Sequence, residues 1–196
     1  MPDRPPEPWN SFLRDVDEFV SEEIHLHLLG GFVVTVIYGA ARETSDLDVL
    51  TTVRLDPKLL EYAGQGSELH RKHGVYLDPV GVAPLPENYE DRLIPVFMGS
   101  YKNLRLFTLD PYDIALTKIE RNTERDRDDV KHLAKAVPFD LKVLERRYNE
   151  ELRVLLGNPE LEDLTLKLWI DMINESQSMS FNELFNREKP IHLIPQ

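Results

Sequence analysis

Two aspartates, Asp46 and Asp48, lie one residue apart in an apolar segment that also contains Leu47, Val49 and Leu50. Side chains on a strand alternate between its two faces, so these carboxylates should point the same way, about 7 Å apart along the strand. Unpaired on a buried strand, they would repel each other and lose the solvation that stabilises their charges. A hard divalent ion compensates best, because Mg²⁺ prefers oxygen ligands and is commonly held by carboxylates together with substrate phosphates. The pair therefore predicts a site for Mg²⁺ or Mn²⁺.

The alternative is an ordinary pair of carboxylates, solvated at the edge of a sheet or bridged by Arg42. Residues upstream of the pair favour the metal site. Gly30 and Gly31 are expected to form a turn between a strand and a helix, and glycines let backbone N–H groups approach a phosphate closely. Arg42 and Thr44 shortly precede the aspartates, where they could also meet a phosphate.

A second polar segment could supply positive charge. Lys118, Arg121 and Arg125 are spaced by three and then four residues, so one helical face would carry all three if the helix continued. Such a face could hold a triphosphate. The alternative is a solvated helix face, on which Asp126 and Asp129 form ordinary ion pairs with their neighbours.

Hydrophobic periodicity divides the chain into two parts. In the first part, strands are expected at 24–29, 47–53, 75–82, 93–98 and 103–108, and helices at 10–23, 32–38 and 57–73. The GQG tripeptide at residues 64–66 could interrupt the last of these helices. In the second part, four helices are expected to end near residues 121, 136, 157 and 176, with N-caps at Asp110, Thr123, Asp140 and Asn158. The sequence therefore predicts an α/β or α+β domain with a mixed sheet and flanking helices over residues 1–109, and a helical C-terminal subdomain over residues 110–196.

Composition limits the classes of protein to consider. The 196 residues are 41% apolar and 30% charged, which is typical of a globular protein, and no apolar run is long enough for a membrane span. The absence of cysteine excludes disulfides, thiolate zinc sites and cysteine nucleophiles, and it suits the cytoplasm. The first residues contain no apolar signal segment. The net charge of −12 repels nucleic acid and membranes, so a polyanionic substrate would need a local basic patch or bridging metal ions.

Three segments together resemble a known family. LGG at residues 29–31 and RETSDLDVL at residues 42–50 are similar to the signature of the nucleotidyltransferases of the DNA polymerase β superfamily, in which a Gly-Gly or Gly-Ser pair precedes Asp-apolar-Asp/Glu-apolar. The fourteen-residue spacer and the Arg-x-Thr before Asp46 are typical of a bacterial branch that includes toxins of type IV toxin–antitoxin and abortive-infection systems. Lys118, followed by R-D-x-x-D at residues 125–129, resembles the later motif of the same branch.

The resemblance also implies a third carboxylate on a later core strand, where it is often the base that deprotonates the acceptor hydroxyl. Asp78, in the apolar segment 75–82, is the residue expected there. The alternative is that Asp78 forms a turn with Pro79, since Asp-Pro is a common turn pair. Weaker candidates in the following loop are Glu87, Glu90 and Asp91.

The resemblance implies the nucleotidyltransferase fold and an enzyme that moves a nucleotidyl group from an NTP to an acceptor hydroxyl, with Mg²⁺ or Mn²⁺ in two-metal phosphoryl transfer. From the toxin branch, the expected acceptor is the 3′ end of a tRNA and the expected partner is an antitoxin protein, while protein, nucleotide and antibiotic acceptors stay open. The implied metal ligands are Asp46, Asp48 and Asp78, and the implied catalytic residues are these three with Lys118 and Asp126. The implied nucleotide-binding residues are Gly30, Gly31, Arg42, Thr44, Ser45, Lys118 and Arg125.

Two other functions stay open. The chain could bind a nucleotide or a partner protein without turnover, as a catalytically inactive module. Helices over residues 110–136 could bind DNA or act as a scaffold, although acidic residues there cancel the basic ones. The pairs His25/His27 and His70/His73 could each bind a transition metal, although neither has a third ligand at a suitable spacing.

Overall fold

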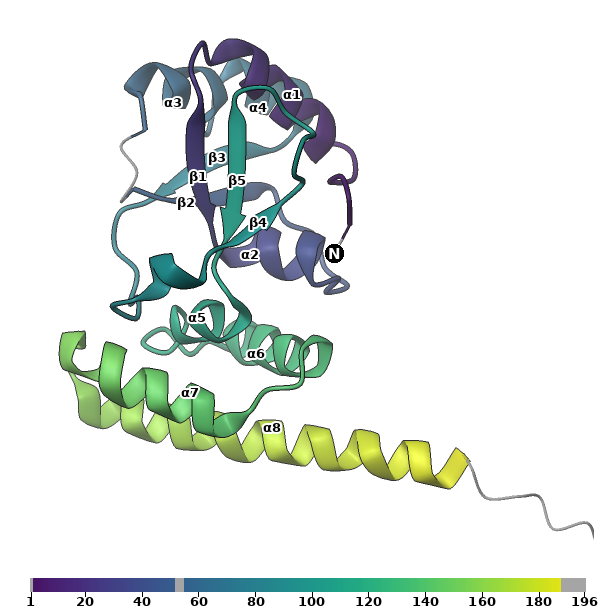
Figure 1. Ribbon diagram of the computed structural model, residues 1–196, viewed down its shortest axis with the longest axis vertical. Coiled ribbons are helices and arrows are strands. Elements are labelled where there is room, and N and C mark those ends of the chain that lie inside the picture. Colours follow the sequence, from purple (N-terminus) through teal and green to yellow (C-terminus); the bar gives the residue numbers. More distant parts are fainter. Residues whose placement is uncertain (1, 52–54, 188–196) are drawn as a thin grey trace, which may run out of the picture.

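The computed structural model describes residues 2–51 and 55–187, and the side chains of these residues as far as 178. Its centre is a five-stranded sheet in the order β3-β2-β1-β5-β4 (Figure 1). The strands are β1 (Ile24–Leu28), β2 (Asp46–Leu50), β3 (Tyr76–Val80), β4 (Ile94–Val96) and β5 (Leu104–Thr108). β1 pairs with β5 and β2 with β3 in parallel, whereas β1–β2 and β4–β5 are antiparallel. The mixed sheet confirms the predicted α+β class and is consistent with a nucleotidyltransferase fold.

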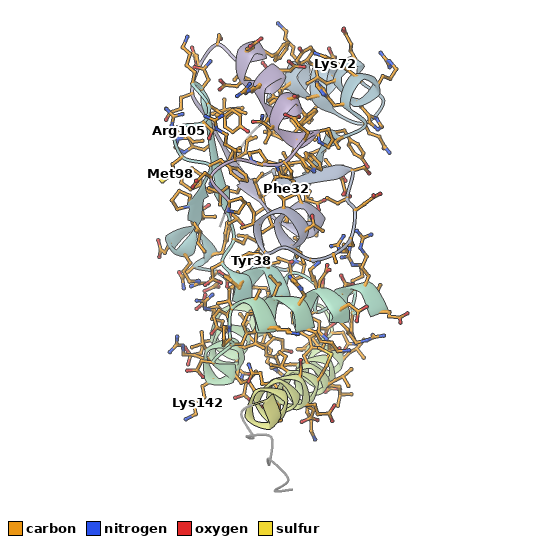
Figure 2. All side chains as sticks on the ribbon, turned by 90° about the vertical axis from the view of Figure 1, so that its right-hand side faces the viewer. Phe32, Tyr38, Lys72, Met98, Arg105 and Lys142 are labelled. Carbon is orange, nitrogen blue, oxygen red and sulfur yellow. The ribbon has the colours of Figure 1, made fainter. Side chains whose placement is uncertain are left out.

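The helices surround the sheet unevenly. They are α1 (Trp9–Phe19), α2 (Gly30–Phe32), α3 (Pro57–Ala63), α4 (Glu68–His73), α5 (Pro111–Leu116), α6 (Glu124–Ala136), α7 (Leu141–Arg147) and α8 (Pro159–Arg187). The first four lie with the sheet, and α5 to α8 gather at the other end of an elongated molecule (Figure 1). In Figure 2, Lys72 marks the first end, Lys142 marks the second, and Tyr38 lies between them. Within residues 2–51 and 55–187, no helix combines the length and apolar character that crossing a bilayer requires.

The two faces of the sheet carry different side chains. Leu28 of β1 pairs with Val49 of β2, and both are fully buried, as is Leu47. These residues share one hydrophobic core with apolar residues of α1 and α2. Because neighbours along a strand point to opposite faces, Asp46 and Asp48 point away from this core. Both are half-buried, as the sequence pattern requires.

The pairing of β2 with β3 brings further polar residues to the same face. In this parallel pair, Asp46 stands opposite Tyr76 and Asp48 stands opposite Asp78. Residues that are opposite each other on adjacent strands point to the same side of a sheet. The second face of the sheet therefore carries carboxylates from two strands.

A proline lies inside each edge strand of the sheet. Pro79 belongs to β3 and is opposite Val49, and Pro95 belongs to β4 and is opposite Phe107. Proline has no backbone N–H, so within a sheet it is largely confined to edge strands. Asp78 and Pro79 are thus part of a strand, and the alternative of an Asp-Pro turn is wrong.

The structure corrects several predicted helix bounds. The segment 57–73 forms two helices, and the break falls at the GQG tripeptide that the sequence offered as an interruption. The hydroxyl of Ser67 accepts from the N–H of His70 (3.1 Å) and starts α4 anew. α2 continues as the π-helix η1 (Val33–Ile37), and α7 continues as the π-helix η3 (Tyr148–Leu152) and the 3₁₀ turn η4 (Arg153–Leu155). A further 3₁₀ turn, η2 (Tyr89–Arg92), precedes β4, and α8 extends past the expected end at residue 176. The end of the strand expected at 47–53, and residues 188–196 of the expected subdomain, lie outside the described residues.

Candidate functional site

Three carboxylates meet on the second face of the sheet. β2 supplies Asp46 and Asp48, and β3 supplies Asp78. Each offers an oxygen, and the three oxygens lie within 4.8 Å of one another. Among the described side chains, those of residues 2–51 and 55–178, no other group of three or more His, Asp or Glu is arranged in this way, so neither histidine pair belongs to one. Oxygen donors at this spacing suit a hard divalent cation such as Mg²⁺ or Mn²⁺.

These three residues are here called the triad, and the negative charge of Asp48 is the one that its surroundings disfavour. Burial raises the pKa of Asp48 to about 6, and the neighbouring charge of Asp46 adds to this effect, as does Asp78. A hydrogen bond from the N–H of Gly31 to Asp48 Oδ2 (3.2 Å) opposes it. Asp46 receives a different partner, because the hydroxyl of Thr44 donates to its Oδ1 at 2.5 Å. Like charges this close call for a cation.

The turn at Gly30 and Gly31 presses against these carboxylates. Gly30 has a φ of +69°, and a Cβ added there would overlap the carboxylate of Asp48. A Cβ on Gly31 would lie 2.6 Å from Thr44 Oγ1 and 3.3 Å from Arg42 Nη1. The position of Gly30 thus favours glycine through its backbone conformation, and a side chain at Gly31 would displace Thr44 or Arg42. The structure brings these four expected nucleotide-binding residues together beside the triad.

Two cations near the triad share one buried carboxylate. Lys118 and Asp129 are each only 3% exposed, and Lys118 Nζ donates to Asp129 Oδ2 at 2.9 Å. Arg42 approaches the same carboxylate with two parallel bonds, from Nε at 3.0 Å and from Nη2 at 2.9 Å. The remaining Nη1 of Arg42 is buried and has no hydrogen-bond partner within the described part of the chain. Asp129 therefore fixes Arg42, and with it the segment that leads into β2.

Asp126 has a different environment from the one expected. Its carboxylate completes the N-terminal capping box of α6 with Thr123, and Arg121 donates to both of its oxygens, at 2.9 and 2.6 Å. These partners hold the pKa of Asp126 well below its usual range despite its burial. Lys118 Nζ lies 3.6 Å from the same carboxylate. The structure thus places Asp126 behind Lys118 and outside the triad.

The single cationic helix face that the spacing suggested does not form. α5 ends at Leu116 and α6 begins at Glu124, so the three basic residues lie on a turn and on the start of a new helix. Lys118 points inward to Asp129, and Arg121 turns back to Asp126. Thr123 is the N-cap of α6, so a new helix starts there and the earlier helix does not continue. Helical spacing of the basic residues cannot detect such an interruption.

Two hollows flank the triad. The smaller has a volume of about 250 Å³ and is lined by Gly30, Asp48 and Lys118, with an apolar wall from Val80, Val82, Ala83 and Pro84. The larger has a volume of about 730 Å³, and the expected site residues that line it are Arg42, Thr44, Ser45, Asp46 and Arg125. Ser45 and Arg125 are both exposed there. Space for ligands therefore exists on both sides of the carboxylates.

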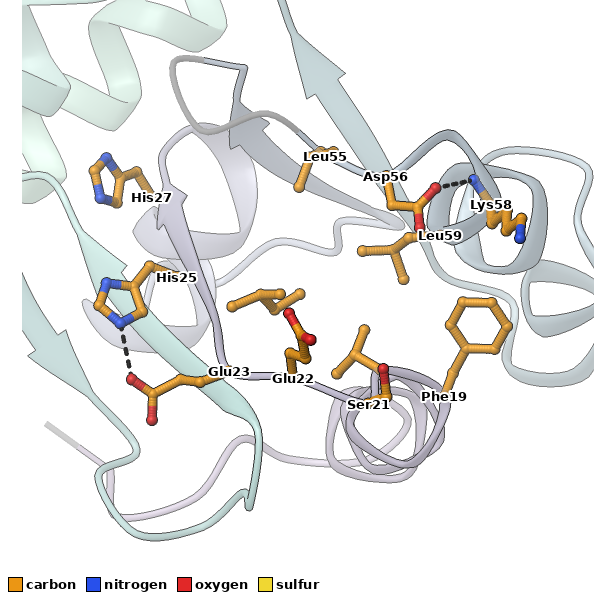
Figure 3. Close-up of a pocket in the computed structure, with 12 residues that line it drawn as sticks. Phe19, Ser21, Glu22, Glu23, His25, His27, Leu55, Asp56, Lys58 and Leu59 are labelled. Carbon is orange, nitrogen blue, oxygen red and sulfur yellow. Dashed lines mark hydrogen bonds and ion pairs between the residues drawn. The ribbon is translucent and has the colours of Figure 1, made fainter.

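A third hollow, of about 850 Å³, lies away from this chemistry (Figure 3). The end of α1, the start of β1 and the start of α3 line it. His25 Nε2 interacts with Glu23 there at 3.1 Å, and the carboxylate of Asp56 accepts from the backbone N–H of Lys58 at 2.9 Å. No triad residue lines this hollow, so we do not place the site there. The weaker third-carboxylate candidates Glu87, Glu90 and Asp91 also lie outside the triad.

Sequence reasoning missed Tyr76, which lies beside the triad, and considered His70, which packs against it, only as a metal ligand. Tyr76 is opposite Asp46 in the sheet, and burial raises the pKa of its hydroxyl, with further contributions from Asp46, Asp78 and Asp48. The ring of His70 lies 4.7 Å from the ring of Tyr76. The alternation in the segment VYLDPV, which places Tyr76 on the face of Asp78, was the signal that could have identified it.

Comparison with known proteins gave one match. The family model described as nucleotidyltransferase of unknown function (DUF6036) matches residues 12–177, a range that contains the triad, the glycine turn and the buried cations. No curated protein and no solved structure matched the chain.

Proposed function

The chain belongs to this nucleotidyltransferase family, and from that premise we propose that it moves a nucleotidyl group from an NTP to an acceptor hydroxyl, with Mg²⁺ or Mn²⁺ as cofactor. The observation that carries the proposal is the triad of Asp46, Asp48 and Asp78, with its three oxygens within 4.8 Å, beside a glycine turn. Carboxylates from two neighbouring strands are a fitting donor set for ions that bind triphosphates.

The triad would hold the metal through carboxylate oxygens. The raised pKa of Asp48 supports this assignment, because a bound cation would offset the repulsion from Asp46 and Asp78. When bound, the metal supplies charge stabilisation at the attacking and leaving oxygens of an in-line displacement. The protein contributes the register of β2 against β3, which holds the donors at their separation before any ligand binds.

The phosphates would lie against the glycine turn. The hydroxyl of Thr44 and the free Nη1 of Arg42 both face Gly31, which leaves no room for a Cβ. Ser45 and Arg125 extend this lining into the larger hollow. Lys118 lies on the smaller hollow, together with Gly30 and Asp48. Its charge lowers the pKa of Asp48 and would neutralise phosphate charge.

The proposed step is a single displacement at phosphorus. The acceptor oxygen forms a bond to the α-phosphorus, the bond from the α-phosphorus to the bridging oxygen breaks, and pyrophosphate leaves with that oxygen. The hydroxyl proton passes to Asp78, which lies on β3, on the side of the triad away from the glycine turn. Asp46 and Asp48 remain ionised as ligands throughout.

A second candidate function is nucleotide binding without turnover. The observation that favours it is the engagement of Arg42 and Lys118 by Asp129, because cations that are already paired bind phosphate less strongly. The resemblance to the toxin branch makes the 3′ end of a tRNA the first acceptor to try and an antitoxin protein the first partner to seek.

The test is transfer of label from α-³²P-NTP. Each NTP is incubated with Mg²⁺ or Mn²⁺, tRNA, total RNA and cell extract, with the wild-type protein and with an Asp46→Asn/Asp48→Asn double variant. We expect labelled acceptor with the wild type and a loss of at least about a hundredfold in the double variant. The matched control is Asp128→Asn, which removes an acidic side chain that is 68% exposed on α6 and should leave transfer unchanged.

NTP binding separates the two candidate functions. Equilibrium dialysis that detects metal-dependent NTP binding by a protein that transfers no label to any acceptor class would favour the binding module. Equal labelling by the wild type and the double variant would contradict the assignment of the triad.

A further inference from the structure

The ring of Tyr76 borders the triad on the side of the sheet edge. Tyr76 is the first residue of β3, opposite Asp46, and its side chain lies on the same face as Asp46 and Asp78. It is half-buried, so part of the ring stays open to a ligand. None of the residues that we assign to the phosphates belongs to β3.

A second ring holds Tyr76 in place. The centroid of His70, on α4, lies 4.7 Å from that of Tyr76, with an angle of 50° between the rings. His70 Nδ1 accepts a hydrogen bond from the backbone N–H of Gly66 at 2.9 Å, which fixes the ring and leaves its proton on Nε2. Tyr76 and His70, here called the ring pair, are therefore oriented before any ligand arrives.

The order of the strands indicates whether the ring pair lies on the side of the acceptor or on the side of the leaving pyrophosphate. The glycine turn follows β1, the triad begins on β2, and the ring pair lies at β3, so β2 separates the phosphate-binding turn from the rings. In an in-line displacement, the attacking oxygen and the leaving pyrophosphate lie on opposite sides of the phosphorus. If pyrophosphate leaves towards the glycine turn, the acceptor enters from β3.

The chemistry of the ring pair narrows the class of acceptor. Aromatic side chains next to a reaction centre bind planar bases by stacking, largely without sequence preference. The cations of α4 are engaged elsewhere, since Lys72 donates to Asp15 at 2.6 Å and Arg71 Nη1 donates to Gly66 O at 2.5 Å. Recognition through a base therefore fits this edge better than recognition through phosphates.

Building on the proposed transferase function, we propose that the ring pair binds the base of a nucleoside whose ribose hydroxyl is the acceptor. Stacking on Tyr76 would place the attached ribose over Asp78, next to the α-phosphate. A ring-free alcohol would lack this anchor and would be a poor acceptor. The acceptor class is thus a free nucleoside or the terminal nucleoside of a longer molecule.

The first measurement is binding without catalysis. Equilibrium dialysis of the full chain in EDTA with tritiated adenosine, guanosine, cytidine or uridine is compared for wild type, Tyr76→Phe and Tyr76→Leu. We expect Tyr76→Phe to bind within about threefold of wild type and Tyr76→Leu to bind at least tenfold more weakly. Equal binding by all three proteins would overturn the inference.

A second variant guards against misfolding of the strand. His70→Asn keeps an acceptor for Gly66 N–H where Nδ1 stood and removes the ring, and it leaves β3 untouched. We expect a severalfold loss of nucleoside binding with an unchanged circular dichroism spectrum. No loss would overturn the assignment of His70 to the ring pair.

Label transfer then separates this inference from the proposed function. With nucleoside as the acceptor, Tyr76→Leu should raise the KM for nucleoside at least tenfold and leave the KM for NTP unchanged, and glycerol should accept no label. Nucleoside binding that depends on Tyr76, in a wild-type protein that transfers nothing, would contradict the transferase and support the ring pair. Transfer to nucleoside that Tyr76→Leu leaves unchanged would support the transferase and contradict the assignment of the ring pair. Label on the protein itself that Tyr76→Phe abolishes would overturn the inference by making the Tyr76 hydroxyl the acceptor.

Discussion

Asp48 is the residue on which most constraints of the site converge. It lies on β2 opposite Asp78, it accepts from the N–H of Gly31, and it leaves no room for a side chain at Gly30. Its neighbours on both strands are also acidic, and its pKa is raised to about 6. A group in this position lowers the stability of the metal-free protein whenever it is ionised.

The stability of the metal-free protein should therefore fall as pH rises from 4 to 6. In this window, Asp48 is protonated in the folded state and ionised in the unfolded state, so the folded state binds more protons and loses stability with rising pH. The loss amounts to at most about 3 kcal/mol. Chemical denaturation in EDTA from pH 4.5 to 8 measures it. Asp48→Asn should remove most of this slope and stabilise the protein at pH 7, and an unchanged slope in this variant would contradict the assignment.

Gly30→Ala should abolish transfer. The variant places a left-handed alanine in the turn, which costs about 1–2 kcal/mol, and its Cβ would displace the Asp48 carboxylate. Gly99→Ala is the matched control, because Gly99 has a φ of +74° and open space around its Cβ position. Urea denaturation should show a similar loss of stability in both variants, because both place an alanine at a positive φ, and only Gly30→Ala should lose label transfer. Activity in Gly30→Ala close to that of Gly99→Ala would show that the contact with Asp48 is dispensable.

At the scale of elements, Asp129 joins α6 to the segment before β2. It is 3% exposed and forms ion pairs with both Arg42 and Lys118. The capping box at Thr123 starts α6 at the position that points Asp129 inward, one turn along the helix. The segment that leads into β2 is thus held in place by a helix that lies far away in the sequence.

Asp129→Asn should destabilise the protein by about 3–5 kcal/mol, because it leaves the partly buried Arg42 without its carboxylate partner and leaves the buried Lys118 only the more distant carboxylate of Asp126, at 3.6 Å. Asp128→Asn is the control, since Asp128 is 68% exposed and lies 3.9 Å from Lys131, a pair that should contribute no more than about 0.5 kcal/mol. Urea denaturation of both variants measures the difference. Equal stabilities of the two variants would mean that the ion pairs of Asp129 with Arg42 and Lys118 do not stabilise the protein.

Local pattern explains which elements could be predicted from the sequence. Strand alternation placed Asp46 and Asp48 on one face, and the capping signals at Asp110, Thr123 and Asp140 placed the helix starts, because both depend on neighbouring residues alone. For the segment 57–73, periodicity alone could not decide between one helix and a break at GQG, and the structure has the break, with Ser67 as the cap of the second helix.

Long-range pairing explains what could not be predicted in the site. The bond between Arg42 and Asp129 joins residues 87 positions apart, and no periodicity connects them. The register of β3 against β2 depends on how a long parallel connection packs, so the position of Tyr76 beside Asp46 followed only from the structure. The roles of the individual site residues remain predictions that the variants above test.

At the scale of the molecule, partly buried hydrogen bonds connect the part that contains the sheet with the helical end. Arg92 of η2 donates to Asp113 of α5 at 2.9 Å and to Glu151 of η3 at 2.8 Å. His132 of α6 interacts with the carbonyl oxygen of Tyr38 at 2.7 Å. The hydrophobic core is also one cluster that extends across both ends. These contacts predict that the two ends unfold together.

The two tryptophans allow a direct test of this cooperativity. Trp9 lies in α1 and Trp169 in α8, and both are buried. In Trp9→Phe and in Trp169→Phe, the fluorescence of the remaining tryptophan and the far-ultraviolet circular dichroism should give the same urea midpoint within each variant. Separate midpoints would instead support independent units with a boundary near residue 109.

The prolines of the edge strands have a consequence for the protein in crowded solution. An edge strand exposes unpaired N–H and C=O groups that can template pairing with another chain, and the candidate site sits on such an edge, β3. Pro79 removes a backbone donor within β3, and Pro95 does the same at the opposite edge. Pro79→Val should therefore leave the triad side chains in place while accelerating aggregation, measured as light scattering at 37 °C against wild type. The edge next to the triad is thereby kept closed to a second strand beyond the single bridge between Leu77 and Gly64.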